Sequence, residues 1–126
     1  MSALVFALAA CAGGLGAAVR YLVDVGVAAA LRRGRPSAAP AFGWGILVVN
    51  VTGSFVLGFV TALLPDAAFV FGAGFLGGYT TFSTAVLDSI GLWRDRARAA
   101  SALHLVGTFG ASVLAAILGL WIGLNL

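Results

Sequence analysis

The sequence predicts an all-α integral membrane protein of four transmembrane helices, with the third helix broken near its middle. Three observations support this prediction: 62% of the 126 residues are hydrophobic and only 9% are charged, the mean hydropathy is +1.12, and the apolar residues form four long runs. A soluble domain of this length has too small a core to bury so much apolar surface. We therefore expect one compact membrane unit with no soluble domain.

The four predicted spans cover nearly the whole chain. Their approximate ranges are 3–31, 41–64, 67–93 and 98–125, and each meets the requirement of about 20 residues for a helix that crosses a hydrocarbon layer about 30 Å thick. The chain has one histidine and no glutamate, and it lacks metal-ligand spacing and a phosphate-loop pattern. An enzyme is therefore not expected.

Arginines distinguish the two ends of the predicted bundle. Six of them lie in the connections between spans one and two and between spans three and four: Arg32, Arg33, Arg35, Arg94, Arg96 and Arg98. The opposite end holds both termini and the turn at 65–68, none of which contains Arg or Lys. By the positive-inside rule, both termini should face outward from the plasma membrane. Basic residues beside membrane spans indicate contact with the headgroups of the lipid bilayer, not with nucleic acid.

Arg20 and Asp24 lie four residues apart where the first apolar run ends. This spacing places both side chains on one helix face and allows them to pair. Arg20 as an interfacial anchor that extends to the headgroups is the simpler interpretation. The alternative is a positive charge that collects anions at the vestibule of a pathway.

The stretch GGYTTFSTA at 77–85 concentrates glycines and hydroxyls inside the third span. Glycine permits unusual backbone angles, and Thr and Ser side chains offer competing local hydrogen bonds, so we expect a break between Gly77 and Thr80. Non-helical backbone at membrane depth persists only where it is buried in protein or lines a polar cavity. Its freed carbonyl oxygens suit a small cation such as sodium. Gly74 and Gly78 can also form a small-xxx-small helix contact, and both interpretations can hold at once.

Polar residues on two other spans are candidates for the same region. Asn50 is the only amide in the interior of a predicted span, since Asn125 lies at the very end of the fourth, and it either bonds across helices or contacts a permeating species. On the fourth span, His104, Thr108 and Ser112 are spaced four residues apart and form one polar stripe. The Thr108 hydroxyl either lines a pathway or bonds to a carbonyl one turn earlier.

Four segments of the chain resemble the Fluc (CrcB-type) family of small bacterial fluoride channels. They are GGLGAAVRY at 13–21, GILVVNVTGSFVLG at 45–58, GFLGGYTTFSTA at 74–85 and GASVLAAILG at 110–119, the last with Ala111 where a glycine is usual. The resemblance covers essentially the whole chain. It implies an antiparallel dimer of four-helix subunits that encloses two passive fluoride pathways and a central structural sodium ion. The implied role is the export of fluoride ion to relieve its toxicity.

The resemblance also implies which residues form the sites. The residues that match the fluoride pathway are Asn50, Thr81, Phe82, Ser83, Thr84 and Ser112. Those that match the sodium site, through their main-chain carbonyls, are Gly77 and Thr80. The family lines its pathway with two phenylalanines three residues apart, whose positive ring edges can attract an anion. Phe82 matches the first, but the second position is Ala85.

The arginine distribution and Ala85 together lead to the hypothesis of a heterodimer. An antiparallel homodimer must insert in both orientations, which requires a near balance of Arg and Lys across the membrane. We therefore expect an oppositely oriented homologous partner with the reverse bias. A homodimeric fluoride channel that tolerates Ala85 is the nearest alternative. A small proton-coupled exporter would need a carboxylate in the membrane interior, whereas Asp24 and Asp88 fall at span ends. A purely structural membrane subunit, with glycines that serve packing alone, would not need both Asn50 and TTFST.

Overall fold

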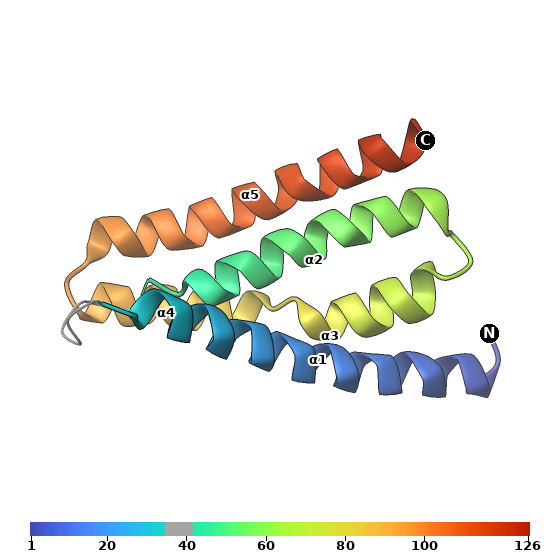
Figure 1. Ribbon diagram of the computed structural model, residues 1–126, viewed down its shortest axis with the longest axis horizontal. Coiled ribbons are helices and arrows are strands. Elements are labelled where there is room, and N and C mark those ends of the chain that lie inside the picture. Colours follow the sequence, from blue (N-terminus) through green and yellow to red (C-terminus); the bar gives the residue numbers. More distant parts are fainter. Residues whose placement is uncertain (35–41) are drawn as a thin grey trace.

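The protein is a bundle of long helices (Figure 1), and the computed structural model describes residues 1–34 and 42–126. The elements are α1 (Ala3–Arg32), α2 (Trp44–Leu63), η1 (Ala68–Leu76), α3 (Gly77–Tyr79), α4 (Phe82–Arg94) and α5 (Arg98–Leu124). The third span consists of η1, α3 and α4. Four spans are long and apolar enough to cross a membrane. The prediction of an all-α, multi-pass membrane protein with a broken third helix is confirmed.

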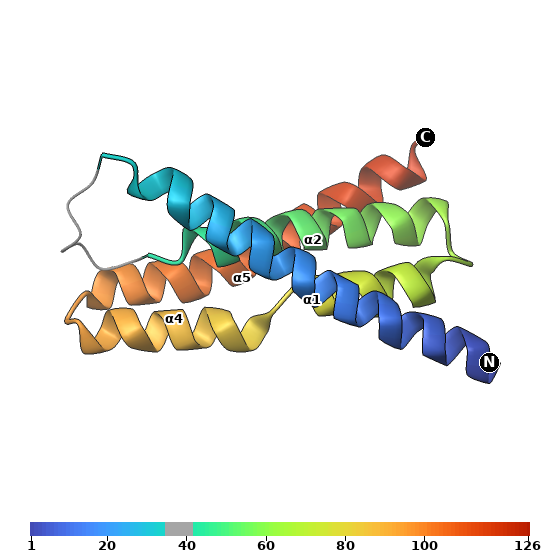
Figure 2. The same ribbon diagram turned by 60° about the horizontal axis from the view of Figure 1, so that its bottom comes forward.

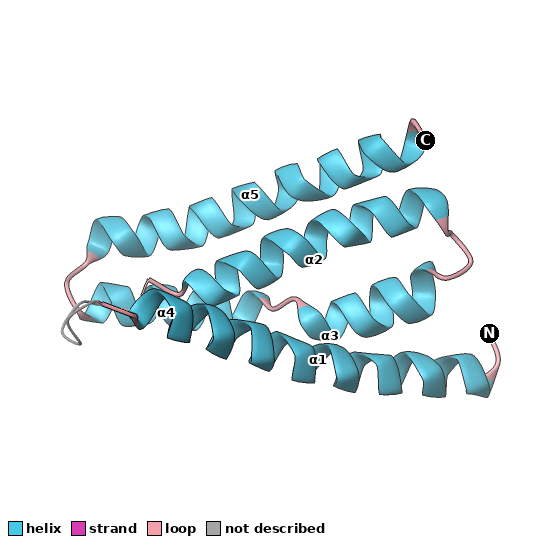
Figure 3. Ribbon diagram, viewed as in Figure 1, coloured by secondary structure: helices cyan, strands magenta, loops and turns pink. Residues whose placement is uncertain are grey.

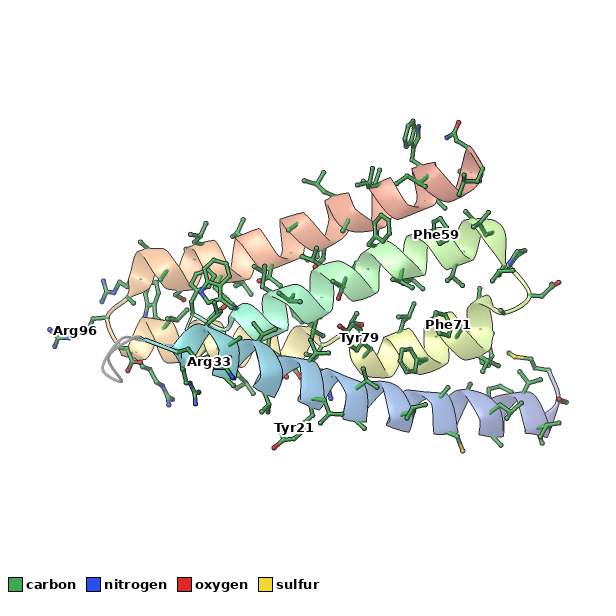
Figure 4. All side chains as sticks on the ribbon, viewed as in Figure 1. Tyr21, Arg33, Phe59, Phe71, Tyr79 and Arg96 are labelled. Atoms are coloured by element: carbon green, nitrogen blue, oxygen red, sulfur yellow. The ribbon has the colours of Figure 1, made fainter. Side chains whose placement is uncertain are left out.

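The two ends of the bundle differ in charge as expected. Both termini and the α2–η1 connection lie at one end, and the connections that follow α1 and α4 lie at the other (Figure 1). The side chains of Arg33 and Arg96 extend at this second end (Figure 4). Arg35, which was counted in the same cluster, lies outside the described residues.

Local sequence accounts for where the helices begin. The Ser2 hydroxyl caps α1 by accepting a hydrogen bond from the Val5 N–H at 3.3 Å. Before α2 stands Gly43, which has a φ of 74°, a left-handed conformation that glycine adopts without steric cost. The helix therefore starts at Trp44, while residue 41, where the sequence places the second span's start, lies outside the described part of the chain.

Small residues allow α1 to approach the third span closely. A Cβ atom added to Gly16 would overlap the carbonyl of Phe75, and one added to Gly78 would overlap the backbone of Gly13. Gly74 meets the backbone of Ala9 in the same way. Figure 2 shows α1 crossing the third span near its break. Thus Gly74 and Gly78 form the predicted small-residue contact, in the same segment that breaks.

The interior of the single chain is unusually polar. Among residues 1–34 and 42–126, six hydrophobic residues are buried, and so are six polar ones: Asn50, Thr81, Ser89, Ser101, His104 and Thr108. Most large apolar side chains lie on the outside, as expected for helices whose outer faces contact lipid. Polar contacts therefore specify much of how these helices meet.

The first part of the third span is a π-helix, which the sequence analysis did not anticipate. At its end, the Gly77 N–H points at two carbonyls, those of Gly72 and Gly74. The rings of Phe71, Phe75 and Tyr79 stack along one face, with centroids 5.3 Å and 6.3 Å apart. The π-helix leads directly into the break, in keeping with the tendency of π segments to occur near functional sites.

Candidate functional site

The break in the third span consists of two extended residues, Thr80 and Thr81, seen as the loop between α3 and α4 (Figure 3). The N–H and the hydroxyl of Thr80 both donate to the Leu76 carbonyl at 2.9 Å, which completes the last turn of the first half. The Thr81 hydroxyl then caps α4 by accepting from the Thr84 N–H at 3.3 Å. The break therefore occurs at the end of the predicted range 77–80 and extends to Thr81, while Gly77–Tyr79 remain helical. Threonines end one helix and begin the next.

Asn50 of α2 binds both main-chain polar groups of Thr81. Its Nδ2 donates to the Thr81 carbonyl at 2.8 Å, and its Oδ1 accepts from the Thr81 N–H at 2.7 Å. Both residues are buried, so these bonds replace the helical ones that the break removes. Because a carboxamide nitrogen carries two hydrogens, one N–H of Asn50 remains for another acceptor.

The same rearrangement leaves the carbonyls of Gly77 and Thr80 without their usual donors. In a continuous helix they would accept from Thr81 and Thr84, but the Thr81 N–H donates to Asn50 and the Thr84 N–H donates to the Thr81 hydroxyl. Gly77 is also exposed on the surface of the single chain. These two carbonyls are thus available to bind a cation or a donor from another molecule.

A cavity of about 290 Å³ lies beside the break, between α2, α4 and α5. Its lining consists of Asn50, Ser54, Thr80, Thr81, Phe82, Ala85, Leu105, Thr108, Phe109, Ser112, Val113 and Ala116. Phe82 and Phe109 are 68% and 64% exposed, so the cavity opens on the outer surface of the single chain. It contains amide, hydroxyl and aromatic groups and no charged side chain.

Two hydroxyls in this cavity lack any hydrogen-bond partner. Within residues 1–34 and 42–126, the hydroxyls of Thr108 and Ser112 are the buried side-chain polar atoms with no partner. Other hydroxyls in the chain do bond to the carbonyl four residues earlier, as Thr61 does to Leu57 at 2.7 Å. Thr108 therefore does not bond to the carbonyl one turn earlier, which was one of the two interpretations of its hydroxyl. Unpaired buried hydroxyls are costly, so a ligand that accepts hydrogen bonds would suit this position.

The cavity gathers most, but not all, of the predicted pathway residues. Ser83 and Thr84 are absent from its lining, and their hydroxyls instead lie 3.4 Å and 3.1 Å from the Thr81 hydroxyl. Sequence reasoning missed Ser54, although it stands four residues after Asn50 and therefore on the same face of α2. Phe109 was also missed, because one aromatic among many apolar residues gives no distinguishing signal.

Arg20 lies on α1, away from the cavity lining. Asp24, on the same face, packs against α2, because a Cβ added to Gly45 would overlap the Asp24 carboxylate. Arg20 itself is half-buried and is not among the residues that line the cavity.

Comparison with known proteins identifies the family. The family model described as "CrcB-like protein, Camphor Resistance (CrcB)" matches residues 7–123. The chain belongs to the CrcB family. It is 44% identical to the fluoride-specific ion channel FluC 1 of Leifsonia xyli subsp. xyli over 98% of this chain and 89% of that protein.

Other CrcB relatives are similar over most of their length. The fluoride-specific ion channel FluC 2 of Mycobacterium bovis is 43% identical over 87% of this chain and 83% of that protein. The fluoride-specific ion channel FluC of Rhizobium meliloti is 40% identical over 86% of each. The resemblance deduced from the four sequence segments is therefore confirmed.

Proposed function

We propose that this chain is a subunit of a passive, fluoride-selective channel that lets fluoride ion leave the cell. The cavity with its two unpaired hydroxyls carries the proposal. A small anion must exchange its hydration shell for donors of similar strength, without a full positive charge that would trap it. The hydroxyls of Thr108 and Ser112 and the remaining N–H of Asn50 are such donors. The names of its CrcB relatives support fluoride as the ion.

Seven residues are proposed to form the pathway, Thr108 and the six that match it by sequence. Asn50, Thr81, Phe82 and Ser112 line the cavity directly, and Phe82 presents a ring whose positive edge can face an anion. Ser83 and Thr84 contribute indirectly, because their hydroxyls contact the Thr81 hydroxyl and can fix its orientation. Arg20 remains a candidate for a vestibule charge, acting at longer range than these contacts.

Liposome efflux tests this function. Vesicles that contain the reconstituted dimer should lose fluoride quickly down its gradient, with no loss of chloride and no need for a pH gradient. Fluoride movement that requires a proton gradient would favour the exporter alternative. Equal loss of chloride would reject selectivity for fluoride.

We also propose that an inverted homologous subunit covers the break. Gly77 is exposed in the middle of the third span, and the nearby Thr52 and Tyr79 hydroxyls form an exposed hydrogen bond at 3.0 Å. Polar backbone that faces hydrocarbon costs several kcal/mol for each unpaired group. A second protein subunit would exclude lipid from this region and complete the wall of the open cavity.

A structural sodium ion at this interface fits the groups present. Carbonyl oxygens at unwound helix segments bind sodium in membrane proteins, and the carbonyls of Gly77 and Thr80 have lost their helical donors. Among the described residues, no group of three or more His, Cys, Asp or Glu side chains could hold a metal. Main-chain oxygens from two subunits would therefore provide the ligands.

The arginine distribution supports a heterodimer in the plasma membrane with both termini outside. The described arginines of the connections, Arg32, Arg33, Arg94, Arg96 and Arg98, belong to one end of the bundle, which favours a single orientation. In a Cys11→Ser background, Leu126→Cys should react with a membrane-impermeant maleimide added outside intact cells. Labelling of about half the molecules would instead indicate both orientations, and hence the homodimer.

A further inference from the structure

A second polar cluster lies at the arginine-rich end, one helical turn beyond the cavity. His104 is completely buried there. Its Nε2 lies 3.2 Å from the carbonyl oxygen of Gly43, and its Nδ1 lies 3.1 Å from the hydroxyl of Ser89. The Phe42 ring packs edge-to-face on the imidazole, with centroids 5.1 Å apart. His104 thus joins α5, α4 and the start of α2.

The number of hydrogens in this cluster determines which of its hydrogen bonds can form together. A carbonyl can only accept, so the Nε2 of His104 carries a hydrogen. The Ser89 hydroxyl has one hydrogen but two neighbours that can accept it, the Ala85 carbonyl at 2.8 Å and His104 Nδ1 at 3.1 Å. With neutral His104, the hydroxyl bonds to only one of them. With protonated His104, Nδ1–H donates to Ser89, which donates to Ala85, and all three contacts are satisfied.

This alternative connects His104 to the cavity. Ala85 lines the cavity, and the Ser89 hydroxyl that donates to its carbonyl also contacts His104 Nδ1. Thr108, one of the unpaired hydroxyls, stands one turn after His104 on the same face of α5. A proton on the imidazole therefore adds a positive charge beside the end of the hydroxyl stripe.

Charged groups around His104 come from two other helices. A Cβ added to Gly43 would lie 2.6 Å from Asp88 Oδ2 and 2.7 Å from His104 Nε2, so the carboxylate of α4 and the imidazole both flank this glycine. Asp24 of α1 packs against Gly45, two residues after Gly43 in the chain. Helix α2 has no titratable side chain, and the arginines of α4 and α5, Arg94 and Arg98, are exposed at helix ends.

We propose that His104 is a proton-responsive positioning residue that controls anion flow through the cavity. Its protonation places a positive charge one helical turn outside the cavity, where the charge raises the local concentration of fluoride and speeds its passage without contacting the ion. The inference rests on the fluoride pathway proposed above. HF that enters a cell releases one proton with every fluoride ion. The pH at the arginine-rich end, proposed to face inward, therefore falls when fluoride accumulates there.

The test is the pH profile of fluoride efflux from liposomes that contain the assembled dimer. The pH is equal on both sides and varied from about 5.5 to about 8, the window in which histidine changes charge. Protein-free vesicles supply the HF leak to subtract at each pH. Flux should rise about threefold to tenfold towards the acidic end. The variant His104→Gln, whose amide can still donate to Gly43, should conduct with a flat profile.

Two further measurements separate this role from simple packing. Ser89→Ala should move the midpoint of the pH profile, whereas Thr61→Val, which removes an exposed hydroxyl with a similar local bond, should leave it unchanged. The chain has one histidine, so with ¹⁵N label in this chain alone the ring signals of the wild-type dimer report the protonation of His104. Their titration midpoint should match that of the flux, even if a variant fails to fold.

Each negative result has a distinct meaning. Wild-type efflux that does not change with pH, or an imidazole that keeps one protonation state throughout the window, overturns the role of His104 and leaves the channel function intact. Absence of fluoride efflux at every pH would instead reject the proposed function itself. An unchanged profile in His104→Gln also overturns the inference.

Discussion

The side-chain amide of Asn50 forms two hydrogen bonds with the main chain of Thr81, one to its carbonyl and one from its N–H, 2.8 Å and 2.7 Å long. The amide thus replaces the backbone partners that the break removes from Thr81. A carboxamide provides one donor and one acceptor side by side, so leucine or aspartate cannot make both bonds. Helix α2 thereby fixes the break beside the cavity.

The variant Asn50→Asp should be both less stable and poorly conducting. Its carboxylate still accepts from the Thr81 N–H but faces the Thr81 carbonyl without a hydrogen to donate, which costs about 1–3 kcal/mol. The new negative charge also repels an anion at the cavity wall. Thermal unfolding in detergent and fluoride efflux measure the two effects, and efflux should fall at least about tenfold.

The matched control is Asn125→Asp. Asn125 makes a comparable bond to the Trp121 carbonyl at 2.7 Å, but at the exposed end of α5, where water can replace the lost partner. This variant should unfold and conduct like the wild type. If Asn50→Asp also unfolds at the wild-type temperature, the pair with Thr81 does not hold the break.

Removal of the unpaired hydroxyls should reduce conduction without loss of stability. Thr108→Val and Ser112→Ala delete buried hydroxyls that have no partner in the described chain, so the fold loses no hydrogen bond and avoids a desolvation cost of about 1–3 kcal/mol. We expect an unchanged or higher unfolding temperature and slower fluoride efflux. A variant that unfolds earlier but conducts normally would show that the hydroxyl serves the fold instead.

The sequence predicts the fold class and the position of the break because both depend on local composition. Apolar runs set the spans, and the glycines and hydroxyls of residues 77–85 weaken the helix where it breaks. The buried amide of Asn50 was expected to need a partner. That the partner is Thr81 did not follow from local pattern, because the two residues are 31 positions apart and meet only when α2 packs on the third span.

Other features depend on tertiary packing that no periodicity reports. The π-helix Ala68–Leu76 contains the glycine that meets α1 at Ala9, and its hydrophobic pattern does not differ from that of an α-helix. The environment of His104 is another such feature, since its contact with Gly43 spans 61 positions. The hydroxyl stripe was visible in the sequence, whereas the cavity that it lines was not.

Substitution of Gly16 by alanine should destabilise the protein through a clash with the third span. Its Cβ would overlap the Phe75 carbonyl, and backbone cannot move aside as a flexible side chain can. Overpacking of this kind costs about 1–3 kcal/mol. The control is Gly14→Ala on the same helix, where an added Cβ meets nothing within 4 Å, and which should unfold at the wild-type temperature or slightly above it. Equal unfolding temperatures for both variants would contradict the close contact.

The last prediction concerns Ala85, which lines the cavity one turn after Phe82 and is 2% exposed. In Ala85→Phe, a second ring would enter the cavity of about 290 Å³ and present another positive edge to the anion. If Ala85 degrades one of the two pathways that the family resemblance implies, fluoride efflux from the proposed dimer should increase by up to about twofold, because the other pathway is unchanged. Ala85→Leu fills similar space without the ring quadrupole and should give no increase. An equal increase in both variants would assign the effect to packing, and a loss in Ala85→Phe alone would mean that this pathway needs the space that alanine leaves.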